Sequence, residues 1–472
     1  MMKPSTRSLL IALSATALFL AANTVCLAKD LYWVSLIPVG LLATWLFVCR
    51  LETGLMAMAM LTPLALDVTL MPGMELSMPV EPMMILFSGI FLFRTLVDRT
   101  FDSRILRHPI SLAILAQLVW MLITSATSTL PAVSFKYLAA RLWFVIPFYF
   151  AAVQIFRNYR RIRQFYWSYA IGLAFVILYA TVGTLNHLHD LQTLHRVMCP
   201  FYNDHTAYGC VIALFLPAAI YFLLDGSWRS RLKLPVAAFV GLLCIGLFFS
   251  YCRAGWLSIL AAIGVYALIR LGMKLKWMVL LFALGVGGFF AYQGDIMYKM
   301  GKNKQDSSLD LAGQIQSISN ISTDASNLER LNRWASALRM FKEHPALGCG
   351  PGTYQFLYAS YQRSYQKSVI STDFGNRGNA HSEYIGPLTD QGVPGLICVL
   401  AVFLITFATG VRIYRTSPDP QVARMALAFT LSLLTYYVHG VFNNFLDTDK
   451  LSVPFWAFTA VITSLDLYSH KQ

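Results

Sequence analysis

The chain has 472 residues, of which 57% are hydrophobic and 13% are charged, so it is far more apolar than a soluble globular protein. Apolar runs of about 17 to 25 residues, enough to cross a hydrocarbon core of about 30 Å, recur throughout. The formal net charge of +14 does not indicate nucleic acid binding, because basic residues orient a membrane protein and attract anionic lipid. We expect an all-α polytopic membrane protein, since backbone groups in lipid are satisfied within each helix.

The apolar runs divide the chain into three parts. We predict a membrane domain over residues 1–294, a large, partly helical loop over 295–384 and C-terminal membrane spans over 385–472. The first run, from Ser8, resembles a signal peptide, but its length and the immediate start of the next run favour a retained span. About 12 to 14 transmembrane helices are expected, near residues 8–28, 31–49, 53–72, 82–98, 110–128, 141–156, 165–185, 206–224, 234–251, 255–271, 276–294, 385–411, 425–442 and 451–468.

Basic residues predict the orientation of these spans. With the amino terminus in the cytoplasm, most Lys and Arg residues of the short loops fall on the cytoplasmic side, as the positive-inside rule requires. Residues 295–384 carry further basic residues, but a loop of this length crosses the membrane regardless of its charge. Both termini are therefore expected in the cytoplasm and the long loop outside.

The eight cysteines are scattered mainly through apolar runs, without the spacing of a metal site. Most of them fit small core residues. Cys199 and Cys349 both lie outside the predicted spans. They are either two free thiols or, if that side is oxidising, a disulfide.

The long loop contains several recognisable segments. Residues 301–323 form a polar lead-in, and an amphipathic helix is predicted over 326–343, ending at His344-Pro345. The sequence GCGPGTY, residues 348–354, then predicts tight turns that let the backbone double back or approach a ligand closely. A second, weaker helix is predicted over 353–367. The apolar face of the first helix is predicted to comprise Leu328, Leu331, Ala335, Leu338 and Phe341.

The loop ends in GNRGNAHSEY, residues 375–384, directly before a long apolar run. A lone histidine is usually structural, but the imidazole of His381 stands at a membrane surface and titrates near neutral pH, with an ordinary pKa of about 6.5. It is a candidate general base, or a group that positions a hydroxyl. Glu383 and Tyr384 would orient it or bind sugar hydroxyls, and His439 would line the same cleft from the last external turn.

Four arginines are predicted on the same outer side of the membrane as His381. Arg196 and Asn203 lie in LHRVMCPFYNDHTAY, Arg253 lies in SYCRAGW between two spans, and Arg330 lies on the loop helix beside Arg333. The planar guanidinium stays charged and binds phosphate oxygens in two-pronged fashion, so these side chains suit a diphosphate. The alternatives for Arg196 and Arg253 are snorkelling or structural pairing. For Arg330 and Arg333, simple solvation on the outer face of the helix is the favoured interpretation.

Asp447-Thr448-Asp449 raises a metal hypothesis, because closely spaced acids bind divalent ions in many nucleotide-sugar transferases. The alternative is a hydrophilic turn that keeps Lys450 paired. The sequence contains no glycine-rich nucleotide loop, HExxH pair or CxxC, so ATP hydrolysis and zinc chemistry lack support. We predict neither a metal nor a cofactor.

The order of these motifs resembles a known family. ERLNRWASALRMFKEHPALGCGPGTYQF followed by NAHSEYIGPLTDQGVPGL is similar to the O-antigen ligase and polymerase family of bacterial envelope glycosyltransferases, whose domain joins a large periplasmic loop to the neighbouring spans. SYCRAGW and CPFYNDHTAYG resemble a span junction and an upstream loop of that family. The resemblance covers roughly 196–456, and the earlier residues match only as generic spans. Ser382 stands where family members often carry Asn, and the family has about twelve spans.

The resemblance implies a metal-independent, inverting transfer of a glycan from undecaprenyl diphosphate to an acceptor sugar hydroxyl at the periplasmic face of the bacterial inner membrane. The acceptor would be lipid A-core for an O-antigen ligase, the favoured interpretation, or a growing glycan for a polymerase of O-antigen or exopolysaccharide repeats. The functional histidine of the family maps to His381, and its diphosphate-binding arginines map to Arg196 and Arg253, with Arg330 a third.

A transporter or flippase is the alternative from another class. It predicts ionisable residues deep within spans and symmetry-related halves. Asp67 and Asp390 lie near the ends of predicted spans, and the sequence has no detectable repeated halves. A 90-residue external loop is also superfluous to simple transport.

Overall fold

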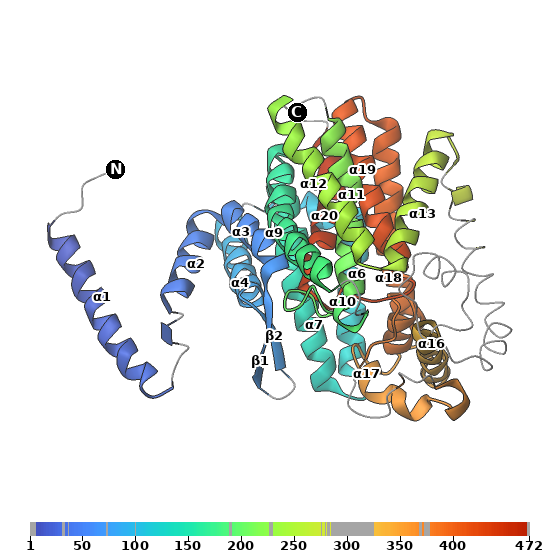
Figure 1. The fold of residues 1–472 in the computed structure, drawn as a ribbon, viewed down its shortest axis with the longest axis horizontal. Helices are drawn as coiled ribbons and strands as arrows, with labels where there is room; N and C mark the ends of the chain where they lie inside the picture. Colours follow the sequence, from blue (N-terminus) through green and yellow to red (C-terminus); the bar gives the residue numbers. More distant parts are fainter. Residues whose placement is uncertain are drawn as a thin grey trace. The chain divides into compact units, whose positions relative to one another are not determined.

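The computed structural model describes residues 6–30, 34–35, 37–71, 74–99, 101–187, 191–225, 230–274, 276–278, 280, 284, 325–367, 371 and 378–469 (Figure 1). Its contacts divide the chain into two units, residues 1–54 and 55–472. The first unit contains α1 (Thr6–Leu27), α2 (Ile37–Cys49) and the first turn of α3 (Leu51–Leu61). Many apolar side chains of α1 and α2, such as Leu18 and Leu41, are exposed, as expected of helices that face lipid.

The second unit is a bundle of long apolar helices, which confirms the predicted all-α polytopic membrane protein. Within the described part of the chain, eight helices are long and apolar enough to cross a membrane, and four shorter helices are also apolar. α19 (Pro420–His439) and α12 (Ser230–Phe249) complete the bundle. The eight are α4 (Val80–Asp98), α6 (Pro109–Ala126), α7 (Pro131–Val145) continued by a π-helical turn (Ile146–Ala151) and α8 (Ala152–Ile155), α9 (Tyr159–Asn186), α11 (His205–Leu224), α13 (Arg253–Arg270), α18 (Ile385–Thr416) and α20 (Asp449–Tyr468).

Two predicted spans differ from the structure. The helix expected over 53–72 ends at Leu61, and a 3-10 turn (Thr62–Leu64) leads into an antiparallel hairpin of β1 (Leu66–Met71) and β2 (Met74–Met78). The span expected from residue 141 begins ten residues earlier, at Pro131. A proline is well suited to the first turn of a helix, which explains this start. The predicted span 276–294 and the lead-in 301–323 lie largely or wholly outside the described residues.

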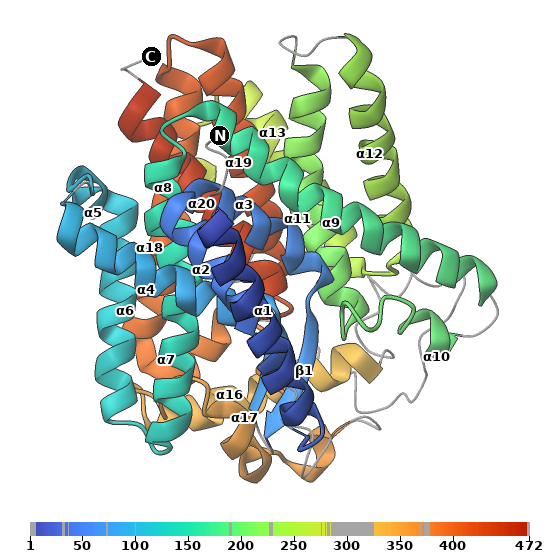
Figure 2. The ribbon, with the colours of Figure 1, turned by 90° about the vertical axis from the view of Figure 1, so that its left-hand side faces the viewer.

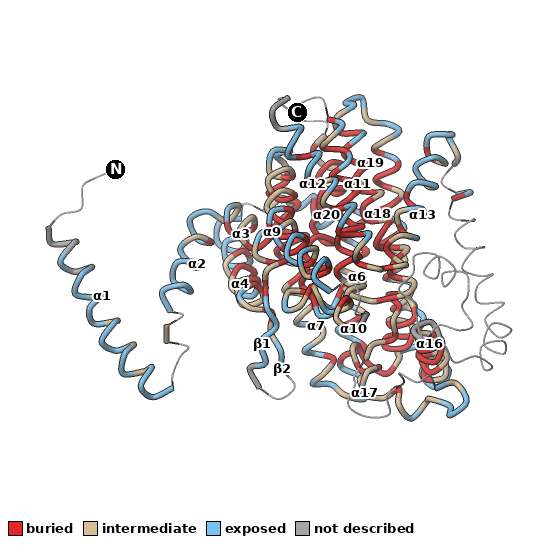
Figure 3. Tube along the Cα trace, viewed as in Figure 1, coloured by how far each residue is buried: buried red, intermediate tan, exposed pale blue. Residues whose placement is uncertain are grey.

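The centre of the second unit is α19, which packs against α11, α13, α18 and α20 (Figures 1 and 2). Figure 3 shows that buried residues concentrate in α11, α19 and α20. Small residues allow these helices to approach closely. A Cβ at Gly410 of α18 would lie 1.8 Å from Thr430 Oγ1 of α19, so only glycine fits there.

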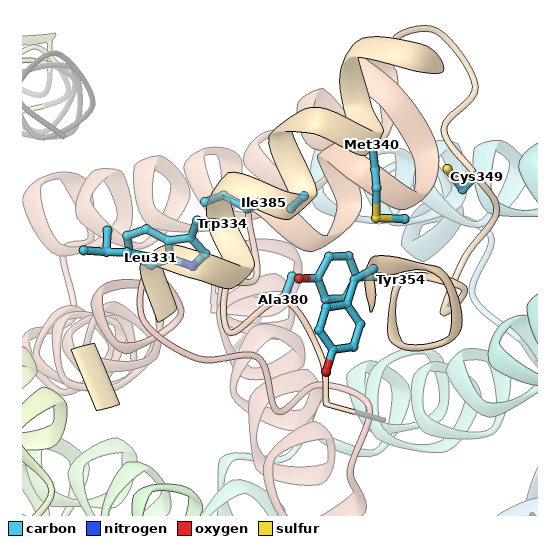
Figure 4. Packing of buried hydrophobic residues seen from close by; sticks show 9 residues of the cluster. Leu331, Trp334, Met340, Cys349, Tyr354, Ala380 and Ile385 are labelled. Carbon is cyan, nitrogen blue, oxygen red and sulfur yellow. The ribbon is translucent and has the colours of Figure 1, made fainter. Parts of the chain in front are cut away.

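The loop helix α16 (Ala325–Glu343) buries a different face from the predicted one. Leu331, Trp334, Ala337 and Met340 pack into a cluster with Cys349, Tyr354, Tyr358, Ala380 and Ile385, as Figure 4 shows for most of these side chains. Leu338 and Phe341 are only partly buried. The helix expected over 353–367 is also wrong as a single element: α17 (Tyr354–Leu357) is followed by two 3-10 turns, Tyr358–Tyr361 and Ser364–Gln366.

The glycine-rich turn after α16 docks against a kink in α18. Gly392 in the kink and Gly348 in the turn both have positive φ, and a Cβ on Gly348 would lie 2.3 Å from the carbonyl carbon of Asp390. The backbone N–H groups of Gly352 and Tyr354 donate to the Asp390 carboxylate at 2.8 and 3.1 Å. The predicted close approach of this backbone is therefore to α18, and it fixes the loop on the bundle just after His381.

Candidate functional site

His381 has a constrained backbone at the start of the segment that leads into α18. Its φ of +48° is left-handed, which is uncommon outside glycine. Local hydrogen bonds stabilise this conformation: His381 N donates to Asn379 Oδ1 at 3.1 Å, and Trp334 Nε1 donates to the His381 carbonyl at 3.4 Å. The histidine is thus held between α16 and α18.

The surroundings of His381 favour the neutral imidazole. Burial, followed by the positive charges of Arg330 and Arg333, lowers its pKa to about 3, while Asp204 and the Asn443 amide oppose the shift. At neutral pH the ring is uncharged and one nitrogen can accept a proton. Because two guanidinium groups produce part of the shift, an anion placed beside them would raise the pKa again.

The two arginines of α16 have different partners. Arg330 is partly buried, and its Nε donates to the Phe442 carbonyl at 3.2 Å, which joins α16 to the loop before α20. The prediction of a solvated Arg333 is wrong. Its side chain is buried, pairs with Glu329 at 2.8 Å, donates to the Asn379 carbonyl at 2.9 Å and lies over the Tyr358 ring. Arg333 therefore has a structural role beside the histidine segment.

The loop before α11 contributes an acid, Asp204, to the surroundings of His381. Asp204 caps α11 by accepting from Thr206 N at 2.9 Å, and it lies 3.2 Å from His205 Nδ1. Burial raises the pKa of Asp204, but its hydrogen bonds with His205 and Thr206 outweigh burial and keep that pKa below its ordinary range. Its charge also acts on His381. The sequence signal for the capping role of Asp204 is its position directly before an apolar run.

Arg253, Arg196 and Asn203 are placed differently by the structure. Arg253 begins α13. Burial lowers the pKa of His195, with smaller contributions from the neighbouring His205 and from Arg253, and the ring of His195 stacks on that of His205 with their centroids 4.3 Å apart. Arg253 and Asp204 thus both act on His195, and Asp204 also acts on His381. Arg196 is exposed in the turn before Cys199, and its role stays a prediction. Asn203 Nδ2 donates to Asp67 at 2.7 Å, so this side chain holds the β-hairpin.

Glu383 is the most strongly held side chain of the segment. Its Oε1 accepts hydrogen bonds from the Tyr436 hydroxyl and from the backbone N–H groups of Phe445 and Leu446, at 2.9 and 3.0 Å for the two amides. Its own N–H donates to the Gly440 carbonyl at 2.8 Å. Glu383 therefore fixes the loop between α19 and α20 relative to His381, and no hydrogen bond to its Oε2 is found among the described residues.

Tyr384 and His439 lie next to this network. The Tyr384 hydroxyl donates to the Tyr437 carbonyl at 2.7 Å, and its ring packs edge-on against Phe403, so it joins α18 to α19. His439 is fully buried at the end of α19, with Nε2 3.2 Å from Asn443 Nδ2 and no hydrogen-bond partner found for Nδ1 among the described residues.

A small cavity extends from Glu383 into the bundle and contains an arginine that the sequence analysis left aside. Its wall includes Gln117 of α6, Tyr137 and Arg141 of α7, Gln391 of α18 and Trp456 of α20. The wrong start predicted for α7 had placed Arg141 at the edge of a span. Because the helix begins at Pro131, Arg141 instead lies within it.

The acidic pair lies where α20 begins. Asp449 is buried and pairs with Lys450 Nζ at 3.2 Å, as the alternative of a paired turn predicted. Among the described residues, no three His, Cys, Asp or Glu side chains are grouped as metal ligands. Cys199 and Cys349 are both free thiols.

Comparison with known proteins identifies part of the chain. Residues 238–400 match the family model described as O-antigen ligase, which confirms the predicted resemblance to the O-antigen ligase and polymerase family. The matched segment includes Arg253, α16, the glycine-rich turn and the histidine segment through the first turns of α18. No curated protein gives a significant match to the chain.

Proposed function

We propose that this chain, a multi-pass membrane protein with the domain of the O-antigen ligase and polymerase family, transfers a glycan from undecaprenyl diphosphate to an acceptor sugar hydroxyl. We favour lipid A-core as the acceptor, as in a ligase. The observation that carries the proposal is the neutral His381 beside Arg330, next to the point where the loop enters α18. This pairing suits a reaction in which a hydroxyl loses a proton while a diphosphate leaves.

The reaction is a single displacement. The acceptor hydroxyl oxygen attacks the anomeric carbon, the bond from that carbon to the diphosphate oxygen breaks, and the hydroxyl proton passes to the neutral imidazole of His381. Attack opposite the leaving group inverts the anomeric carbon. The negative diphosphate beside Arg330 raises the pKa of His381, so donor binding itself makes the histidine a better base.

The donor diphosphate is held by Arg253 and Arg330, with Arg196 at the outer edge. Fixed guanidinium groups neutralise a leaving diphosphate without a metal ion. Transfer should therefore survive a chelator. Complete loss of transfer in EDTA, restored by magnesium, would contradict the metal-independent mechanism.

Arg253→Lys should reduce donor affinity, because lysine keeps the charge but loses the two-pronged geometry.

The proposed orientation has the loop in the periplasm and both termini in the cytoplasm of a bacterial inner membrane. It is supported by arginines near the connections between helices. Arg104 and Arg157 contact Asp102 before α6, and Arg163 in the second turn of α9 contacts Asp225 after α11. Basic residues on one side of a bundle favour that side as cytoplasmic.

The test uses purified protein in liposomes with a lipid-linked glycan and lipid A-core. The parent protein should extend lipid A-core, and His381→Ala should abolish transfer while His344→Ala, which changes an exposed histidine of the same loop, leaves the rate unchanged. Glycan lengthened on its carrier instead of on lipid A-core would identify a polymerase. Transfer at the parental rate by His381→Ala would refute the role of the histidine.

A further inference from the structure

The turn that follows α19 is fastened to the loop elements around the histidine segment. The Phe442 carbonyl accepts from Arg330 Nε at 3.2 Å, and the Asn444 carbonyl accepts from Asn379 Nδ2 at 3.2 Å. Asn443 lies between these two anchored residues. Because the backbone is held on either side of it, the position of its side chain is fixed as well.

The side chain of Asn443 lies between two histidine rings. The residue is buried, and its Nδ2 lies 3.2 Å from His439 Nε2. The amide also hydrogen-bonds with the imidazole of His381. An asparagine side chain has one acceptor oxygen and one donor NH2 group, so its two ends carry out different roles toward the two rings.

The contact with His439 fixes which end of the amide faces which ring. Nδ2 can only donate, so His439 Nε2 accepts and the proton of that ring is on Nδ1, for which no hydrogen-bond partner is found among the described residues. The oxygen of Asn443 remains for His381, and an oxygen can only accept. The hydrogen bond from Asn443 raises the pKa of His381, as expected when the ring donates to the amide.

We propose that Asn443 is a positioning residue, which fixes the proton of the neutral His381 ring on the nitrogen that faces its amide oxygen. In neutral imidazole one nitrogen carries the proton and the other has a free lone pair. Resting on the proposed function, the free lone pair is then the one that takes the proton of the acceptor hydroxyl. His439 acts through Asn443, because it holds the amide in this orientation. A reversed amide would donate to His381 and occupy the lone pair that the reaction needs.

The charges around His381 do not replace this hydrogen bond. Arg330 and Arg333 approach it from α16, and Asp204 approaches it from the loop before α11. Each of these charges acts on the ring as a whole and shifts its pKa. The choice of the protonated nitrogen is set by the hydrogen bond that the ring makes, which here is the one to Asn443.

The first test reads the tautomer directly, by NMR of the full chain labelled with 15N-histidine in detergent micelles at pH 7. The signals of His381 are assigned by their loss in His381→Asn. The parent should show one protonated and one unprotonated nitrogen in a single tautomer, and Asn443→Ala should show a mixture. The matched control is Asn444→Ala, because the Asn444 side-chain oxygen has no hydrogen-bond partner among the described residues. It should leave the His381 signals unchanged.

The second test measures kcat for glycan transfer against pH. Asn443→Ala should lower kcat roughly tenfold with the KM for the donor unchanged, and should move the acidic limb of the profile to lower pH, because the ring loses an acceptor that favours its charged form. Asn443→Asp keeps an acceptor oxygen and adds a negative charge, so it should move the limb to higher pH by about one to three units. A merely structural role would not shift the limb in opposite directions.

The outcomes separate the inference from the proposed function. The same single tautomer in the parent and in Asn443→Ala overturns the inference, and so does an equal change in Asn444→Ala, which would assign the effect to packing of the turn. Should Asn443→Ala fail to fold, Asn443→Asp decides, and loss of the single tautomer there overturns the inference. Normal transfer by His381→Ala would refute the proposed function, whereas the tautomer measurement would still decide the role of Asn443.

Discussion

Glu383→Gln is predicted to loosen the loop between α19 and α20 while keeping the shape of the side chain. In the parent, the carboxylate accepts three hydrogen bonds at Oε1, from Tyr436 and from the amides of Phe445 and Leu446. A hydrogen bond to a charged group contributes about 1 kcal/mol more than a neutral one. Three such bonds give about 3 kcal/mol, which corresponds to roughly a hundredfold increase in the opening of the loop at 1.36 kcal/mol per factor of ten.

Hydrogen exchange read by mass spectrometry on peptides that contain Phe445 and Leu446 measures this opening. Exchange at these amides should accelerate by about two orders of magnitude in Glu383→Gln. The matched control is Glu343→Gln, because Glu343 is an exposed carboxylate whose hydrogen-bond partner is the Tyr361 hydroxyl and not a group of this loop. Unchanged protection of the loop in Glu383→Gln, with the control also unchanged, would show that the carboxylate does not hold it.

Two further predictions concern pH and backbone geometry. The pKa of His381 is about 3 in the folded chain and about 6.5 when unfolded, so the unfolded state binds the extra proton between these values and stability falls as the pH drops through that window. At pH 4.5 His381 should lower the free energy of unfolding by about 3 kcal/mol relative to neutral pH. His381→Asn, which tolerates the positive φ, should lose correspondingly less stability on acidification in thermal melts. Equal losses in the parent and the variant would contradict the low pKa. Gly348→Ala should destabilise the fold by about 2 to 5 kcal/mol, from left-handed strain and overpacking, whereas Gly264→Ala, at a helical site with open space, should not lower the melting temperature.

The sequence predicted the helical membrane fold because hydrophobic run length is a strong signal that depends little on tertiary contacts. It failed where two signals conflict. Residues 53–72 are apolar enough for a span, yet residues 66–71 form a strand, because a turn containing Pro63 ends the helix and a partner strand satisfies the backbone that follows. The position of Arg141 was mispredicted for a similar reason. A charged residue usually marks the end of an apolar run, and only the packing around α7 shows that Arg141 lies inside the helix.

The candidate site was predictable in its chemistry more than in its contacts. His381 and Glu383 were identified from their place in one short motif, but the partners of Glu383 lie some sixty residues further on, in a turn whose position depends on the whole bundle. Arg333 shows the same limit. Helical periodicity placed it on a solvated face, whereas Glu329 and the Asn379 carbonyl satisfy it in the interior. Periodicity cannot reveal such pairing, because it counts every charge as exposed.

The docking of the glycine-rich turn on the kinked α18 has a consequence for modularity. The Gln391 carbonyl at the kink accepts from Trp120 Nε1 at 2.8 Å, and the Cys349 carbonyl accepts from Thr129 N at 3.0 Å. Both donors precede the family-matched segment 238–400 in the chain. An excised segment would leave these carbonyls without their donors in an apolar setting. Chimeras between relatives should therefore exchange the whole unit from Leu55 onward. The family-matched segment, residues 238–400, is shorter than the compact unit that supplies its hydrogen-bond donors.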